Sequence, residues 1–191
     1  MTTTTSQPGF QFPKAYSDFV ARLRVPIGFI LVAAFAWFST PSMTSLWAGA
    51  LIALPGLLLR GWAAGHLRKN STLTKSGPYR FVRNPLYVGT LIVALGMAHA
   101  TQQVGLLILF LSVFLLVYLP AITLEEQHLN NLFPDFHAYR QQVPLLIPYR
   151  KPLPVGRPFE FSLYMHNREY EAALGFLIGM GLLFAKANWM V

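Results

Sequence analysis

The sequence predicts an all-α, polytopic membrane protein of about five transmembrane helices. Three observations support this fold class: the apolar composition, the long apolar segments, and the restriction of basic residues to certain connections. Apolar residues make up 54% of the 191 residues and charged residues only 12%, about half of the roughly 25% that is typical of soluble domains. So few charges cannot cover a folded surface in water, and we therefore expect lipid to cover much of it.

The N-terminal region, residues 1–24, is expected to lie outside the hydrocarbon core. Its first nine residues are polar and Thr-rich, without the apolar core of a secretory signal, so we expect a disordered tail. Tyr16, Phe19 and Leu23 then recur at helical spacing between charged residues. This pattern predicts an amphipathic helix lying in the membrane interface, and the alternative is a cytosolic extension of the first transmembrane helix.

Five apolar segments follow the N-terminal region. They cover residues 25–38, 43–64, 86–100, 104–124 and 172–185. A helix needs ~20 residues to cross a hydrocarbon core of ~30 Å. The second and fourth segments meet this length, whereas the others need flanking residues to reach both interfaces.

The basic residues indicate the orientation of these helices. The short turns at residues 40–42 and 101–103 contain no Lys or Arg, and every basic residue except Lys186 lies on the other connections. By the positive-inside rule, the N-terminus is cytosolic and the C-terminus lies outside the inner membrane. The net charge of +8 is then a topology signal and a contact with anionic membrane lipids, and we expect no nucleic-acid partner.

Small residues in the last apolar segment predict helix packing. Gly175 and Gly179 form a small-xxx-small pair, which lets two helices approach closely. This face of the C-terminal helix could also join two copies of the chain in a homo-oligomer.

A first polar cluster lies where the chain enters the third apolar segment. Asn84 and Pro85 have the residue types of a helix N-cap and of the first helical position. Capping does not explain Arg83 and Tyr87, although an Arg at the end of an apolar helix can also reach lipid phosphates.

A second polar cluster directly follows the fourth apolar segment and contains Glu125, Glu126 and His128. Adjacent carboxylates repel each other and oppose the dipole at a helix C-terminus, although a solvated helix end also accounts for them. The tight turn between the third and fourth segments brings both clusters to the cytosolic side. Ionisable residues that converge there predict a functional site.

An aromatic-rich stretch comes next, with Phe136, Tyr139, Arg140 and Val143 on one side of a short predicted helix. It is expected to act as a lid over a cofactor or as an interfacial anchor.

In this order the motifs resemble those of the isoprenylcysteine carboxyl methyltransferase family and its relatives, the phospholipid N-methyltransferases. The resemblance spans residues 56–148 and rests on Gly77, Pro78, Tyr79, Arg83, Asn84, Pro85, Tyr87, Glu125, Glu126, Phe133, Phe136, Tyr139, Val143 and Pro144. It implies an all-helical membrane methyltransferase core at residues 25–148 with a cytosolic cleft for S-adenosyl-L-methionine. Residues 149–191 then form a linker and an extra C-terminal transmembrane helix. Many relatives have His in place of Asn84.

The resemblance also implies roles for individual residues. The expected cofactor-binding residues are Tyr79, Arg83, Asn84, Pro85, Tyr87, Glu125, Glu126 and Tyr139. Arg83 and Glu126 are the expected catalytic residues. An Arg can hold a carboxylate acceptor, and Glu126 or His128 can accept the proton that an amine acceptor must lose. The acceptor is therefore expected to be a lipid-like or prenylated molecule, methylated on oxygen as in the isoprenylcysteine enzymes or on nitrogen as in the phosphatidylethanolamine enzymes.

Two other functions remain open on the sequence. Sterol reductases share part of the motif set, and the basic residues near Arg140 and Arg150 could bind the 2′-phosphate of NADPH. A non-enzymatic helical membrane scaffold is the second alternative. We expect no metal site, because the chain has no Cys and its His residues lack paired ligand spacing.

Overall fold

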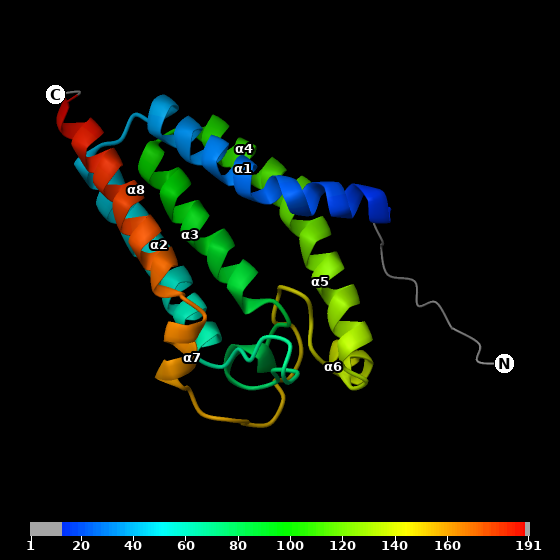
Figure 1. Cartoon of the computed structure of the whole chain (residues 1–191). Helices are drawn as coiled ribbons and strands as arrows, with labels where there is room; N and C mark the ends of the chain where they lie inside the picture. Colours follow the sequence, from blue (N-terminus) through cyan, green and yellow to red (C-terminus); the bar gives the residue numbers. More distant parts are fainter. Residues whose placement is uncertain (1–12, 190–191) are drawn as a thin grey trace.

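The structure is a computed structural model that describes residues 13–189, and all regular secondary structure in this part of the chain is helical. Its elements in order are α1 (Lys14–Phe38), α2 (Met43–Ala64), the 3-10 helix η1 (Gly77–Arg80), α3 (Pro85–Thr101), α4 (Val104–Val113), the π-helix η2 (Phe114–Tyr118), α5 (Leu119–Leu132), α6 (Phe136–Gln142), α7 (Phe161–His166) and α8 (Tyr170–Trp189). Helices α2, α3 and α8 run side by side (Figure 1).

Every predicted apolar segment is helical, so the predicted fold class is confirmed. Three helices are long and apolar enough to cross a membrane: Met43–Ala64, Val104–Leu132 and Tyr170–Trp189. Pro26–Phe38 and Pro85–Thr101 are shorter apolar helices. The fourth segment was predicted too short, because α4, η2 and α5 continue as one helix through Glu125 and Glu126.

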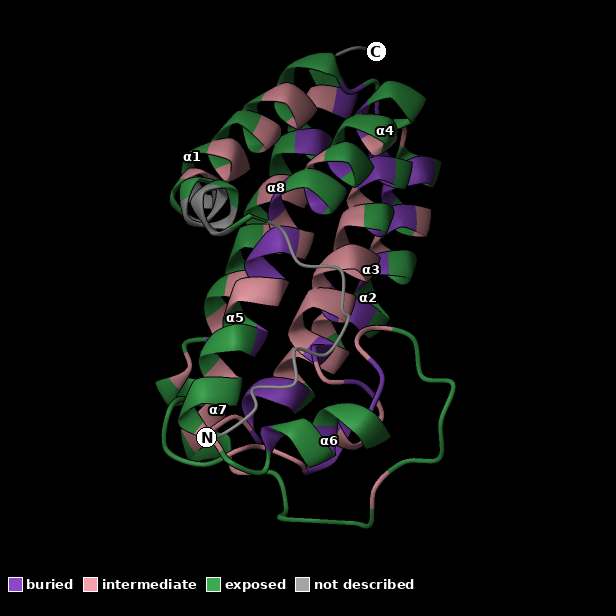
Figure 2. Ribbon diagram, turned by 90° about the vertical axis from the view of Figure 1, so that its right-hand side faces the viewer, coloured by how far each residue is buried: buried purple, intermediate pink, exposed green. Residues whose placement is uncertain are grey.

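Large apolar side chains cover the outside of this bundle. Exposed residues lie along the full length of the outward helix faces (Figure 2). Trp37 and Trp47 are 79% and 74% exposed. Such a surface is unfavourable in water and is suited to lipid.

Helices α2 and α3 approach so closely that only glycine fits between them. A methyl group added at Gly49 would lie 2.5 Å from the carbonyl oxygen of Gly96, and one added at Gly56 would lie 2.7 Å from that of Gly89. In lipid, helices associate largely through such van der Waals contact. Small-residue packing was predicted for the last helix, whereas this close contact between α2 and α3 was not predicted.

The two short turns meet at one end of the bundle, which we call the turn end (residues 39–42 and 102–103). The backbone N–H of Thr40 donates to the carbonyl of Thr101 at 2.9 Å, and the Lys186 ammonium donates to the carbonyl of Ala36 at 2.8 Å. Lys186 therefore lies at the turn end, opposite the loop-rich end formed by residues 65–84 and 133–169 (Figure 1).

Helix α1 is continuous, so residues 14–24 extend the apolar helix and do not form a separate one. It docks on the π-helical break in the helix Val104–Leu132. Pro120 has no N–H to donate to the carbonyl of Leu116, four residues earlier. The hydroxyl of Tyr16 donates to this carbonyl instead, at 2.7 Å. Residues 1–12, which include the predicted disordered tail, lie outside the described part of the chain.

The loop-rich end has a small core of its own. Phe136, Tyr139 and Val143 are buried together. The strand-like segment after α6 pairs with the start of α3, because the N–H of Arg83 donates to the Pro144 carbonyl at 2.8 Å and that of Asn84 to the Leu145 carbonyl at 3.2 Å. These contacts fix α6 against the beginning of α3.

Candidate active site

The predicted site residues line one cleft at the loop-rich end, with a volume of about 170 Å³. They are Tyr79, Arg83, Asn84, Pro85, Tyr87, Glu125, Glu126 and Tyr139. The cleft lies between the beginning of α3, the end of α5 and helix α6. The chain between α2 and η1 forms a further wall, which includes Leu67, Lys69 and Asn70. This wall was not predicted, because a short polar connection carries no motif.

Arg83 and Glu126 form an ion pair in the floor of this cleft. The Arg83 Nε donates to Glu126 Oε1 at 2.6 Å, and a second guanidinium nitrogen donates to Oε2 at 3.3 Å. Their side chains are 10% and 9% exposed. Arg140 also lies 3.8 Å from Oε2 of Glu126. A buried carboxylate with two cationic neighbours is held in place by them.

All three guanidinium nitrogens of Arg83 donate within the protein. In addition to Glu126, they reach the carbonyls of Arg140 and Val143 at the end of α6. Arg83 thus points inward and does not reach toward lipid phosphates. It joins α3, α5 and α6. It was predicted to hold an acceptor carboxylate, but each of its three guanidinium nitrogens already donates a hydrogen bond within the protein.

Asn84 occupies the N-cap position of α3, with Pro85 at the first helical position, as predicted. Its side chain makes no capping hydrogen bond. The amide instead lies 3.5 Å from Glu126 Oε1. Capping therefore does not explain this residue, which extends the polar network around Glu126.

Glu125 differs from its neighbour because it is exposed to the cleft. The hydroxyl of Tyr87 donates to its Oε2 at 3.2 Å. Two adjacent carboxylates thus have different surroundings. Glu126 lies beside the buried Arg83 and the exposed Arg140, whereas Glu125 is open to the cleft.

Two buried tyrosines form another wall of the cleft. The Tyr139 hydroxyl donates to the Tyr79 carbonyl at 2.7 Å, which ties α6 to η1. Burial raises the pKa of both Tyr79 and Tyr139 well above the ordinary value. Both hydroxyls therefore stay protonated, and Tyr139 acts as a donor that closes the cleft.

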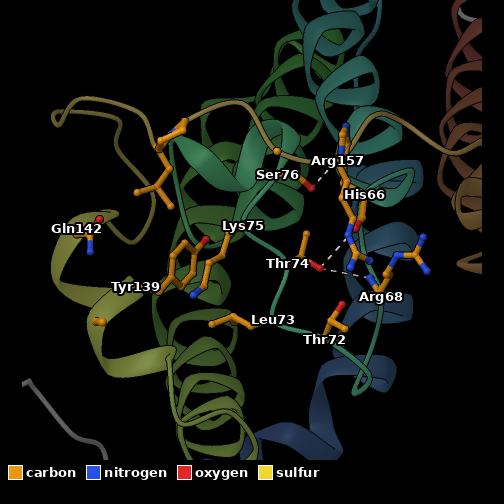
Figure 3. Close-up of a pocket in the computed structure, with 14 residues that line it drawn as sticks. His66, Arg68, Thr72, Leu73, Thr74, Lys75, Ser76, Tyr139, Gln142 and Arg157 are labelled. Carbon is orange, nitrogen blue, oxygen red and sulfur yellow. Dashed lines mark hydrogen bonds between the residues drawn. The ribbon is translucent and has the colours of Figure 1, made fainter.

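A second cavity of about 420 Å³ adjoins the cleft across the connection between α2 and η1. The two share Arg68, Leu73 and Tyr139. Figure 3 shows Tyr139, Lys75, His66 and Arg157 around this cavity. His66 lies 3.1 Å from the Ser76 hydroxyl, and burial lowers the pKa of its ring. The cleft and this cavity together give a polar space open to the loop-rich end.

A third cavity, of about 1260 Å³, extends from the cleft into the apolar bundle. Its walls come mainly from α1, α2, α3, α5 and α8, and most lining residues are apolar. Gly175 and Gly179 both line it, and a methyl group added at Gly179 would lie 3.0 Å from Met97. The face assigned to helix packing therefore points into the chain's own cavity, and the structure gives no support for an oligomer through it.

The large cavity and the cleft meet at shared wall residues. These are Leu67, Lys69, Leu86, Tyr87, Glu125 and His128. His128 faces Asn70 at 3.4 Å across the junction. Across residues 13–189, no group of three or more His, Cys, Asp or Glu side chains could hold a metal ion.

Comparison with known proteins identifies the enzyme family of this chain. A cobalt-zinc-cadmium resistance protein of Cupriavidus metallidurans is 30% identical over 147 residues, which are 71% of this chain and 68% of that protein. The protein-S-isoprenylcysteine O-methyltransferase of Schizosaccharomyces pombe is 29% identical over 141 residues, 71% of this chain and 59% of that enzyme. Phosphatidylethanolamine N-methyltransferase B of Dictyostelium discoideum is 32% identical over 93 residues, 49% of this chain and 45% of that enzyme.

No solved structure matches the chain at a significant level. The sequence profile of the phospholipid methyltransferase family matches residues 23–135, which contain the beginning of α3, the whole of α5 and both Glu125 and Glu126, whereas α6 lies just beyond the match. This match favours a methyltransferase over the reductase and scaffold alternatives. The protein belongs to the phospholipid methyltransferase family of integral membrane methyltransferases.

Proposed function

We propose that this protein transfers the methyl group of S-adenosyl-L-methionine to a lipid-like acceptor at the cytosolic face of the inner membrane. The observation that supports this most strongly is the junction of two unlike cavities. A polar cleft at the loop-rich end and a large apolar cavity share Leu86, Tyr87 and Glu125 in their walls. A water-soluble cofactor can reach this junction through the polar cleft, and a membrane-embedded acceptor can reach it through the apolar cavity.

The residues of the cleft suit this cofactor in charge and in aromatic character. Glu125 offers a carboxylate to a cationic ligand, and Tyr79, Phe133 and Phe136 offer aromatic surface. The cleft alone is smaller than the roughly 300–1,000 Å³ of typical ligand sites. The adjoining cavity of about 420 Å³ supplies the remaining space.

The chemistry needs positioning more than acid–base groups. The bound cofactor supplies a methyl group on a positively charged sulfur, open to in-line attack. The protein contributes proximity and orientation, which can lower a barrier by several kcal/mol, up to roughly 7–11 kcal/mol. In this scheme Glu125 and Tyr87 orient the ligands at the junction, and the Arg83–Glu126 pair keeps α3, α5 and α6 at fixed spacing. Apolar walls of the large cavity exclude water from the acceptor.

The geometry favours a nitrogen acceptor over the carboxyl acceptor of the isoprenylcysteine enzymes. Arg83, the residue expected to hold an acceptor carboxylate, donates with every nitrogen to Glu126 and to backbone carbonyls. Glu125 and His128 line both cavities and can accept the proton that an amine loses before attack. Methylation of a lipid-like amine is thus our first choice, and carboxyl methylation is the second.

Calorimetry with two ligands of different charge tests the role of Glu125. S-adenosyl-L-methionine carries a sulfonium cation, and S-adenosylhomocysteine is its neutral thioether product. A charge-assisted contact contributes on the order of 1.5–3 kcal/mol, so Glu125→Gln should weaken the binding of S-adenosyl-L-methionine by roughly tenfold or more. The same substitution should weaken the binding of S-adenosylhomocysteine much less.

Glu171→Gln is the matched control, because this carboxylate is half exposed at the beginning of α8. It should bind both ligands like the parent. Failure of the parent protein to bind either ligand would refute the proposed cofactor. If Glu125→Gln weakened both ligands equally, the carboxylate would not face the sulfonium. Incubation with methyl-labelled cofactor and fractionated membrane lipids then identifies the acceptor atom.

A further inference from the structure

Arg60 is a charged residue within the apolar helix α2, on the wall of the large cavity. From the sequence it was expected to lie with the loop cations, but it lies inside the helix. Its Nε donates to Oε1 of Glu169 at 2.5 Å, and another nitrogen donates to the Leu86 carbonyl at 3.3 Å and to the hydroxyl of Thr90. A charge inside an apolar helix is costly and usually marks a ligand site or a pathway.

The partner carboxylate comes from outside the family core. Glu169 immediately precedes α8, beyond the family match at residues 23–135. Arg168 adopts a left-handed backbone conformation with φ of 55°, and this turn directs Glu169 inward, where its side chain is only 9% exposed. The Arg60 side chain keeps 22% exposure. The cation thus faces the cavity and the anion lies behind it.

Arg60 also lies close to the proposed site of methyl transfer. It contacts the carbonyl of Leu86, and Leu86 and the next residue, Tyr87, line both cavities. Among the described residues, its polar contacts run through Nε and one amino group. The second amino group is left for a ligand, and a planar guanidinium suits phosphate and carboxylate oxygens.

We infer that Arg60 binds the anionic oxygen group, phosphate or carboxylate, of an amphiphilic acceptor whose tail occupies the large cavity. Glu169 moderates this site by competing for the same guanidinium. The inference rests on the proposed function and deepens it, because it gives the acceptor a negative group between its tail and its methylated atom. It also gives α8 a role in acceptor choice, since α8 lines the cavity and follows directly after Glu169.

Binding of simple amphiphiles to the full-length protein in a neutral maltoside detergent tests this inference. Dodecyl phosphate and dodecanoate are the anionic probes, dodecanol is the neutral probe, and ligand-induced thermal stabilisation gives apparent affinities. Arg60→Gln should weaken the apparent affinity for the preferred anionic probe by roughly tenfold and leave the affinity for dodecanol unchanged. Glu169→Gln should increase the affinity for the anionic probe, because the carboxylate no longer competes for the guanidinium. The probe that responds more identifies phosphate or carboxylate as the recognised group.

Lys151→Gln removes an exposed loop cation, and Glu171→Gln removes an exposed carboxylate near the beginning of α8. Neither control should change the binding of any probe. If both Arg60→Gln and Glu169→Gln weakened all probes equally, the ion pair would only hold α8 in place, and the inference would be wrong. The double variant Arg60→Gln/Glu169→Gln leaves no unpaired buried charge, so it can be tested even if a single variant fails to fold. The inference is also overturned if the double variant keeps the parent's preference for the anion. S-adenosylhomocysteine binding, measured on the same samples, should be unchanged and separates a failure here from a failure of the proposed function.

Discussion

At the scale of single residues, the site depends on two adjacent carboxylates that the fold treats differently. Glu126 lies among Arg83, Arg140 and Asn84, whereas Glu125 faces the cleft with Tyr87. Successive residues on an α-helix point about 100° apart, so one can face the interior and the other a ligand. The buried pair joins α3, α5 and α6, and in the proposed function the exposed carboxylate faces the cofactor.

The Arg83→Lys substitution measures this organising role. A lysine ammonium keeps the charge but cannot reach Glu126 and two carbonyls at once, so α6 should lose its fixed position on α3. We expect a lower unfolding temperature and turnover reduced by roughly tenfold or more. Arg168→Lys, in an exposed ion pair, should behave like the parent. Normal stability and activity of Arg83→Lys would show that any cation suffices there.

At the scale of helices, the α2–α3 contact is the rigid part of the bundle. Gly49, Gly56, Gly89 and Gly96 bring the two backbones together, and a methyl group added at Gly96 would lie 2.4 Å from the Gly49 carbonyl oxygen. Backbone atoms cannot move aside as a side-chain end can. The close contact therefore fixes the beginning of α3, which carries Arg83, Asn84 and Tyr87, relative to α2.

Gly96→Ala tests this contact. Overpacking costs about 1–3 kcal/mol, which corresponds to a drop of about 5 °C in the unfolding temperature for a chain of this size. In α8, Gly181 has open space around it, so Gly181→Ala should leave the temperature unchanged or raise it, because Ala favours helix by about 1 kcal/mol. Thermal unfolding in detergent, followed by Trp fluorescence, compares the two. Equal behaviour of both variants would argue against the tight contact.

At the scale of the whole molecule, polar structure is concentrated at one end. The cleft, the ion pairs Arg83–Glu126 and Arg68–Glu160, and most basic loop residues lie at the loop-rich end. The turn end holds two short turns and Lys186. With the positive-inside rule, this asymmetry predicts a cytosolic cleft and a C-terminus on the opposite side.

Single cysteines test this orientation without background, since the chain has no Cys. Thr40 and Ser71 are both exposed and lie at opposite ends. A membrane-impermeant maleimide should label Thr40→Cys from the outer face of the membrane, and Ser71→Cys only in inverted vesicles, where the cytosolic face is exposed. Labelling of both from one side would contradict the layout, and the reverse pattern would show that the protein has the opposite orientation.

The sequence by itself determined the helical membrane fold, the approximate segments and the residues that gather in the cleft. Apolar length and basic-residue placement are properties of single segments, and the hairpin of the third and fourth segments brings Asn84 and Glu126 to the same end by simple geometry. The eventual partners of each side chain were not predictable in this way. Asn84 was expected to cap α3 and to bind the cofactor, and Arg83 and Glu126 were expected to meet ligands, but nothing in the sequence indicated that these three residues contact each other.

Only the tertiary structure decided the remaining features, because they depend on the distance and rotation between helices. The role of Glu125 follows from which face of α5 points to the interior. The α2–α3 contact needs glycines from two segments at matching heights, and neither row is distinctive alone. The Arg60–Glu169 pair joins residues more than a hundred positions apart, so nothing local in either segment indicates the partner. A single sequence records the residue types, but the packing of α8 on the core determines which charges meet.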